Sequence, residues 1–327
     1  MSRSPGWLRA DLHCHSYHSG HAGHLKFLRS RDCYSPPEAV YRAAKARGMD
    51  LVTITDHDSI DGCLEFLSRR PDAPDFFISE EIECLWPDLP LRLHIAAYDI
   101  NERIHDEVRR LRANVFDVAA YLRSQNVFFA LNHLFFFYNR QLPLRQYVNT
   151  LLPLCPALEV RNGTMLRSHN VLVRALARVE RREGRGRASL IGGSDSHTLR
   201  GVGSTFTEAQ GRTRDEFLAS LRAGRARVGG GHGSIARVAG EIYGVCFNYC
   251  ASLVGGGRQE LSVPRRALGI AWAIASLPAE FVPLLVAVIE KTGEARRMRE
   301  FTRELSGAVE SWLPDSTAPR LQDSHVP

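Results

Sequence analysis

From residue 10 to about residue 200, short apolar segments alternate with longer segments of helical periodicity. The apolar segments are rich in Val, Ile, Leu and Phe, and each ends in polar residues, which is typical of buried parallel strands. In chain order they read RADLHCH, DLVTITDHD, DFFISEEIE, LRLHIAAYD, VFFALNHL, ALEVRNG and ASLIGGSDSH. Repeated strand–helix units of this kind predict a closed α/β barrel. An open, doubly wound sheet is the alternative, although no strand is followed by a glycine-rich nucleotide-binding motif.

The pattern changes after about residue 205. We expect a barrel domain at 8–210, a helical extension at 211–313 that caps the barrel, and a disordered polar tail at 314–327. Within the extension, residues 267–289 are almost entirely apolar, with arginines before them and Lys291 after them, and Pro278 and Pro283 interrupt the run. Two interpretations stay open: two buried helices packed on the barrel, or a broken helical hairpin in a membrane interface with its basic flanks on anionic lipid.

Composition narrows the class of protein only in part. The chain has 327 residues, a formal net charge of +6 and a sequence pI of about 9.1, which suits an anionic small molecule, nucleic acid or an anionic lipid surface. Its seven cysteines include no C-x-x-C pair, so we expect reduced thiols in a cytoplasmic protein. We expect neither a signal peptide nor a simple transmembrane helix, because the N-terminus lacks an apolar core and no long stretch is free of charge and proline.

The polar residues at the predicted strand ends carry the candidate chemistry. In chain order they are His13 and His15; Asp56, His57 and Asp58; Glu80, Glu81 and Glu83; His94; His133; and Asp195 and His197. The C-terminal ends of barrel strands meet at one rim, so these side chains should converge. Imidazole and carboxylate together suit Zn, Mn or Fe, whereas uncoordinated histidines would need a partner for each ring nitrogen. The sequence predicts a metal centre, with a hydrogen-bonded histidine network as the alternative.

The motifs DLHCHS, ITDHDS, SEEIE, LNH and GGSDSH, in this order, resemble those of the PHP (polymerase and histidinol phosphatase) domain. The resemblance covers residues 10 to about 200. It implies a distorted seven-stranded (β/α) barrel with two or three divalent metal ions at its rim. It also implies a phosphoesterase, because the family comprises mostly phosphatases, nucleotide phosphodiesterases and polymerase-attached nuclease or proofreading modules.

The resemblance also implies which residues bind the metals. By motif position, the first metal takes His13, His15, Glu81 and Asp195, the second takes His94 and His133, and the third takes His57 and His197. Asp58 and Glu83 are candidates for orienting these ligands by hydrogen bonds.

The third metal needs one more ligand from the first loop. Many family members have an Asp five residues after the second histidine of the first motif, where this chain has Gly20. We expect His21 to be the ligand, with His18 or His24 as substitutes.

The expected reaction is attack of a metal-activated water on a phosphate ester. Asp58 or His197 would protonate the leaving group, and Arg200 would neutralise charge on the phosphoryl oxygens. Further candidates for the substrate phosphate are Lys26, Arg29, Arg31 and Arg161. Four histidines lie outside the motifs and are expected in structural or solvent roles: His105, His169, His232 and His325.

The favoured hypothesis is a metal-dependent phosphatase or phosphodiesterase that acts on a small phosphorylated molecule. One alternative is a nucleic-acid processing nuclease, although no basic stretch interleaved with aromatic residues is visible. The other is a membrane-surface protein of a lipid-linked pathway, with a metal-binding barrel and peripheral lipid contact through residues 267–289.

Overall fold

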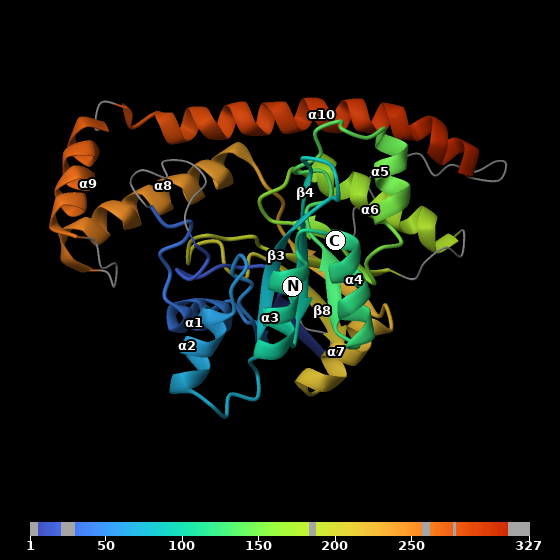
Figure 1. Cartoon of the computed structure of the whole chain (residues 1–327), viewed down its shortest axis with the longest axis horizontal. Helices are drawn as coiled ribbons and strands as arrows, with labels where there is room; N and C mark the ends of the chain where they lie inside the picture. Colours follow the sequence, from blue (N-terminus) through green and yellow to red (C-terminus); the bar gives the residue numbers. More distant parts are fainter. Residues whose placement is uncertain (1–5, 21–29, 183–187, 257–261, 277–278, 313–327) are drawn as a thin grey trace.

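The structure is a computed structural model that describes residues 6–20, 30–182, 188–256, 262–276 and 279–312 (Figure 1). Its first sheet has the strand order β2-β1-β8-β9. The bounds are β1 (Trp7–Asp11), β2 (Leu51–Val52), β8 (Thr205–Gln210) and β9 (Ala226–Gly230). β1 and β2 are parallel, whereas β8 pairs antiparallel with both β1 and β9.

The second sheet has the order β3-β4-β5-β6-β7. The bounds are β3 (Ser79–Leu85), β4 (Arg92–Tyr98), β5 (Phe128–Leu131), β6 (Ala157–Asn162) and β7 (Ser189–Gly193). β5, β6 and β7 are parallel as expected, but β4 is antiparallel to both β3 and β5. The expectation of parallel pairing was wrong here because residues 86–91 are too few for a crossover helix and can only form a tight connection between antiparallel strands.

The two sheets meet where their strands end. Isolated parallel bridges join Cys14 to Ser196 and His57 to Glu81. In addition, the Asp195 amide donates to the His13 carbonyl at 2.6 Å. The sheets are thus two ladders linked at their polar ends, and the described strands do not form the single continuous ladder that the sequence suggested.

Helices cover the outside of this sheet body. They are α1 (Pro37–Ala46), α2 (Asp61–Arg69), α3 (Glu102–Leu111), α4 (Val115–Ser124), α5 (Leu144–Leu151), α6 (Arg167–Arg182) and α7 (Arg214–Arg222). The largest apolar cluster includes Val118 and Leu122 of α4 with Leu158 of β6. A second cluster contains Leu12, Tyr98 and other strand residues. Burial of these apolar surfaces is the main term that stabilises the fold.

The chain between residues 211 and 230 belongs with the sheets. β9 extends the first sheet, and Phe217, Leu218 and Leu221 of α7 are buried in its apolar cluster. The helical extension therefore begins later than residue 211, at α8 (Ile235–Ala251). A π-helical turn (Ser252–Gly256), α9 (Val263–Ser276) and α10 (Val282–Trp312) follow.

The extension partly covers the sheet body. In Figure 1, α10 runs along one side of the molecule above α5 and α6, and α9 stands at the other end beside α8. Within the described ranges, no helix combines the length and apolar character required to cross a membrane. The predicted tail at 314–327 lies outside the described residues.

Candidate metal centre

The strand ends bring the predicted metal-ligating side chains into one buried cluster. Each of four triads has donor atoms within 4.8 Å of one another: His13, His15 and Glu81; His13, His133 and Asp195; His57, Glu81 and His94; and His15, His57 and His197. These are all the predicted ligands that the described residues include. They come from both sheets, so the site depends on the meeting of the two ladders.

Glu81 of β3 is the centre of the cluster. Its Oε2 lies 3.2 Å from His13 Nε2 and 3.0 Å from His57 Nδ1. Its Oε1 lies 3.0 Å from His94 Nδ1 and 3.1 Å from His133 Nε2. Burial alone would raise the pKa of Glu81, but the imidazoles of His13, His94 and His57 hold this pKa well below its usual value. The carboxylate is therefore ionised and suited to bridge two cations.

Several donor atoms of this cluster have no hydrogen bond. His13 Nε2, His15 Nε2, Glu81 Oε2 and both ring nitrogens of His94 are buried without a hydrogen-bond partner among the described residues. Unpartnered buried polar atoms are rare in folded proteins, because each costs free energy. Nitrogen and carboxylate donors that converge without partners fit divalent transition metals. This geometry argues against a hydrogen-bonded histidine network.

A second carboxylate, which the sequence motifs did not indicate, completes the outer part of the cluster. Asp32 Oδ2 lies 2.8 Å from His197 Nε2 and 3.4 Å from His57 Nε2. The His197 ring stacks on that of His15, with 4.2 Å between centroids. Burial alone would lower the pKa of His197, but the Asp32 carboxylate outweighs it and raises this pKa to about 9. Asp32 thus lies against the two histidines that the motifs assign to the third metal.

The histidines proposed as the first-loop ligand lie elsewhere or outside the described residues. His18 Nε2 is 2.9 Å from Glu65 Oε2 of α2, and His18 is absent from the four triads. His21 and His24 lie outside the described residues, as do Lys26 and Arg29. Asp32 is eleven residues beyond His21, in RDCYS, and only its hydrogen-bonding distance to His197 identifies it.

Buried polar side chains orient several of the candidate ligands. Glu159 Oε1 lies 2.8 Å from His13 Nδ1, and Glu159 Oε2 accepts hydrogen bonds from the His133 amide and from Asn162 Nδ2, both at 2.9 Å. Asn162 Nδ2 also donates to Asp195 Oδ2 at 3.0 Å. A carboxylate on the far nitrogen of a metal-binding histidine fixes its tautomer and increases its basicity.

Two further contacts act in the same way. Ser19 Oγ lies 2.9 Å from His15 Nδ1, and Asn132 Nδ2 donates to Glu81 Oε1 at 2.8 Å.

The backbone is strained at two of the candidate ligands. His133 and Asp195 have φ angles of 27° and 50°, in the left-handed region that non-glycine residues rarely adopt. Such strain persists where the surroundings hold a functional side chain in place.

The predicted acid Asp58 lies at the rim and pairs with a cation. Its carboxylate forms an ion pair with Arg112 and accepts a hydrogen bond from the Glu83 amide at 3.0 Å. Glu83 Oε2 lies 3.7 Å from His94 Nε2, and this contact and Arg92 lower the pKa of Glu83 to about 2. Asp56 is buried and accepts two hydrogen bonds from Ser16, at 2.6 Å each.

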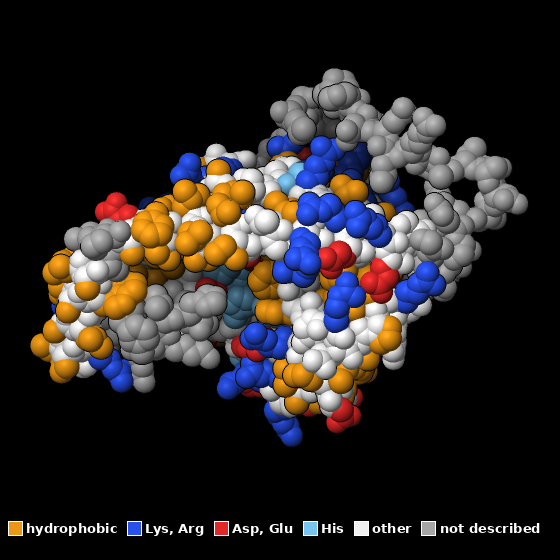
Figure 2. Space-filling view, turned by 90° about the horizontal axis from the view of Figure 1, so that it is seen from above, with side chains coloured by type: hydrophobic (Ala, Val, Ile, Leu, Met, Phe, Trp, Pro, Cys, Tyr) orange, Lys and Arg blue, Asp and Glu red, His pale blue; other side chains and the backbone are white. Residues whose placement is uncertain are grey.

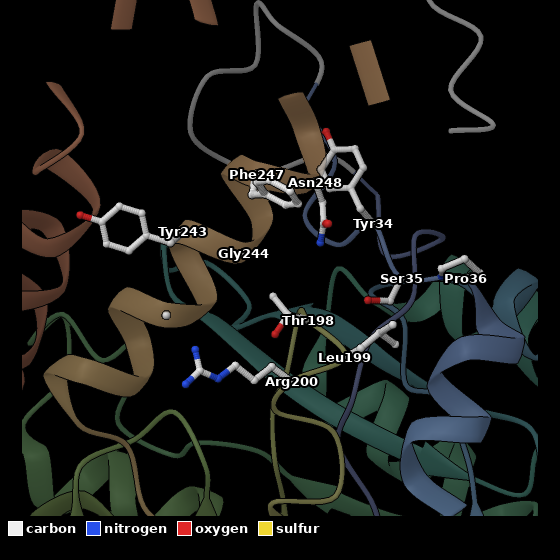
Figure 3. A pocket seen from close by; sticks show the side chains of 11 residues that line it. Tyr34, Ser35, Pro36, Thr198, Leu199, Arg200, Tyr243, Gly244, Phe247 and Asn248 are labelled. Carbon is white, nitrogen blue, oxygen red and sulfur yellow. The ribbon is translucent and has the colours of Figure 1, made fainter. Parts of the chain in front are cut away.

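Arg200 lines a cavity beside the cluster. The cavity has a volume of about 590 Å³ and lies between α8 and the segments that follow Asp32 and His197. Figure 3 shows Thr198, Leu199 and Arg200 on one side and Tyr243, Gly244 and Phe247 of α8 on the other. Glu241 of α8 accepts a hydrogen bond from the His197 amide at 3.2 Å. The cavity is thus fixed to the cluster by α8.

The other arginines predicted to hold phosphate are engaged by backbone carbonyls. Arg161 Nη1 donates to the Gly230 carbonyl at 2.7 Å, and burial lowers the pKa of Arg161. Arg31 donates to the Tyr17 carbonyl.

The described histidines outside the motifs take no part in the four triads. His105 lies 2.8 Å from Glu80, His169 is buried beside Phe135, and His232 contacts Asn170. His325 lies outside the described residues.

Comparison with known proteins shows what parts of this chain are similar to. The PHP-associated family model matches residues 187–226, which contain the GGSDSH motif. An uncharacterized protein of Methanocaldococcus jannaschii is 38% identical over 58 residues, which cover 18% of this chain and 33% of that protein. The match spans only about a third of this curated relative.

Solved structures with a similar arrangement are more distant in sequence. PsfC from Pseudomonas syringae is 16% identical, with a TM-score of 0.47 over 69% of this chain and 92% of that one. An amidohydrolase from Chromobacterium violaceum, with bound sulfate and no metal, is 16% identical. Its TM-score is 0.45, and the match covers 67% of this chain and 97% of that one. A provisionally assigned metal-dependent phosphoesterase from Bifidobacterium adolescentis is 16% identical. Its TM-score is 0.42, and the match covers 65% of this chain and 95% of that one.

The ordered motifs and the family match agree with each other. This chain is similar to PHP-associated proteins over residues 187–226, and its motifs resemble those of the PHP domain.

Proposed function

We propose that this chain is a metal-dependent hydrolase that cleaves a phosphate ester of a small molecule. The observation that carries the proposal is the buried, unpartnered set of donor atoms around Glu81. A protein would not retain such a set for stability, because unpaired buried polar atoms destabilise the fold. The PHP family supports the same reading.

The described side chains provide ligands for two or three cations. We propose His13, His15, Glu81 and Asp195 for the first, Glu81, His94 and His133 for the second, and His57, His197 and Asp32 for the third. Bound there, Zn, Mn or Fe would supply a hydroxide nucleophile at neutral pH and polarise the phosphoryl group.

The protein itself would position the substrate. We propose that Arg200 binds a phosphoryl oxygen, because its guanidinium is exposed at the cavity and is near the segment that carries His197. The cavity would hold the organic part of the ester against Tyr34 and Phe247. The carboxylate of Asp58 is engaged in an ion pair with Arg112 at the rim. His197 would donate the proton to the leaving group only where it does not bind the third cation, because a ring nitrogen that binds a metal carries no proton.

Metal content and hydrolysis test the proposal together. We would assay the protein, loaded with Zn or Mn, against aryl phosphate monoesters, aryl phosphate diesters and single-stranded DNA. His13→Ala and Asp195→Ala should lose both metal and hydrolysis. His18→Ala is the matched control, since His18 follows the same strand but pairs with Glu65. Full activity in His13→Ala would refute the proposal, and preferential cleavage of DNA would favour a nuclease.

A further inference from the structure

The exposed surface of the first part of α10 is apolar. Between residues 281 and 289, every exposed position carries a large hydrophobic side chain, with exposed fractions between 36% and 64%. These residues are Phe281, Val282, Leu284, Leu285, Val286, Val288 and Ile289. Single exposed hydrophobic residues are ordinary, but a contiguous apolar patch marks a binding surface.

Packing within the protein does not require this surface. Ala287 is buried against Val238 and Ala239 of α8, and Pro283 and Glu290 on the same side are half-buried. These positions form a narrow stripe with helical spacing. At about 100° per residue, the exposed apolar positions cover roughly 200° of the remaining helix circumference. The fold therefore uses one narrow side of the helix and leaves a broad apolar side uncovered.

The second part of the same helix provides an internal comparison. Beyond Glu290, exposed positions are polar or charged, including Thr292, Arg296, Arg299 and Arg303. Figure 2 shows hydrophobic side chains gathered over one end of the molecule, whereas most Lys and Arg side chains lie nearer its middle. The apolar surface is thus a local feature of one end of α10.

The neighbouring helices carry exposed hydrophobic side chains as well. Val263, Leu268 and Ile274 of α9 are each more than half exposed, and Phe247 of α8 is 73% exposed. Tyr243 of α8 donates a hydrogen bond to the Glu280 carbonyl at 2.6 Å, so the beginning of α10 is fixed to α8. We use the term apolar face for Tyr243, Phe247, Val254, Val263, Leu268, Ile274 and the seven exposed residues of 281–289.

The apolar face also has a charge signature. Arg265 and Arg266, in the first turn of α9, are exposed, and within the described ranges neither has an ion-pair partner. The sequence of α9 contains no Asp or Glu, and Glu280 is the one acidic residue between 262 and 289. Unpaired arginines beside exposed apolar side chains are the combination that binds anionic headgroups and the adjoining acyl region.

We propose that the apolar face docks on the surface of an anionic phospholipid bilayer. The breadth of the exposed arc on α10 favours this occupant over a second copy of the chain, because a partner helix covers a narrower stripe. Phe247 also lines the cavity beside Arg200. The proposal stands independently of the proposed hydrolysis.

Co-sedimentation of the full chain with vesicles tests this docking. The vesicles would contain phosphatidylcholine alone or phosphatidylcholine with phosphatidylglycerol. We expect binding to the anionic vesicles that weakens with added salt. The double variants Leu285→Ser/Ile289→Ser and Arg265→Glu/Arg266→Glu should each bind at least about tenfold more weakly, since each removes one component of interfacial binding.

Two controls make the result decisive. Arg299→Glu/Arg303→Glu reverses charges on the polar part of α10 and should bind vesicles as the natural protein does. All substituted positions are exposed, so the variants should keep their helical content and metal content, and loss of either would exclude a variant from the comparison. If one of the two test variants is excluded in this way, vesicle binding by the other test variant decides the outcome. Absence of binding to both kinds of vesicle would overturn the proposal. So would a dimer in solution that Leu285→Ser/Ile289→Ser converts to a monomer, because a second copy would then cover the face.

Discussion

Replacing Glu159 by Gln changes one atom of the contact that orients His13. In the protein, Glu159 Oε2 accepts two hydrogen bonds, from the His133 amide and from Asn162 Nδ2, while Oε1 faces His13 Nδ1. A glutamine has a single oxygen, which must stay with the two donors. The amide nitrogen of the glutamine then faces His13 Nδ1. Because this amide can only donate a hydrogen bond, His13 Nδ1 has to accept it. The proton of the neutral imidazole moves to Nε2, the atom that faces Glu81 and Asp195.

An imidazole protonated at Nε2 cannot bind a cation through that atom. The expected loss in affinity for the first metal is about tenfold to hundredfold, which corresponds to roughly 1.4 to 2.7 kcal/mol. Competition titration of Zn against a chelator of known affinity would measure it. Glu208→Gln is the matched control, because Glu208 pairs with Arg9 at 2.6 Å and is absent from the four triads. Equal affinity in Glu159→Gln and in the natural protein would refute the reasoning.

Three further predictions follow from other contacts. Asp32→Ala should bind one metal equivalent fewer by elemental analysis; an unchanged metal content would remove Asp32 from the ligand set. Gly240→Leu should raise KM for aryl esters about tenfold, because a Cβ at Gly240 lies 3.9 Å from Arg200 Nη1 and the leucine side chain would enter the cavity beside that guanidinium; an unchanged KM would exclude the cavity as the substrate site. Lys291→Met should lower the free energy of unfolding by about 3 to 5 kcal/mol in a denaturant titration, because it leaves the buried Glu294 carboxylate without its ion-pair partner. Arg296→Met, in an exposed pair, should cost less than about 1 kcal/mol, and equal losses would contradict the argument.

The positions of the strands could be read from the sequence, but their pairing could not. Apolar runs that end in polar clusters located β1 to β7 correctly, since burial of short strands leaves a clear hydrophobic pattern. Strand direction depends on the connection. Residues 86–91 are too short for a helix, which is a signal in the sequence that the repeated pattern obscured. The pairing of β9 with β8 is a long-range contact that no local pattern specifies.

Part of the candidate site could be predicted from the sequence in the same way. Side chains at strand ends, such as Glu81 and His94, converge because the strand ends meet, and the spacing of the motifs reveals them. Asp32 lies in a loop whose path the sequence does not determine. Glu159 lies within β6 and is indistinguishable in sequence from a solvent-facing glutamate. Residues that act through a hydrogen bond to a ligand are found only once the structure places them there.

The central claim is that the buried cluster around Glu81 binds catalytic metal. The most direct test is elemental analysis of the untagged protein, purified without chelator and then reconstituted with Zn or Mn, combined with a phosphate ester assay of the same sample. We predict two or three metal equivalents per chain and hydrolysis that a chelator abolishes and added metal restores. A folded protein that binds no metal after reconstitution, or hydrolysis that a chelator leaves unchanged, would contradict the claim.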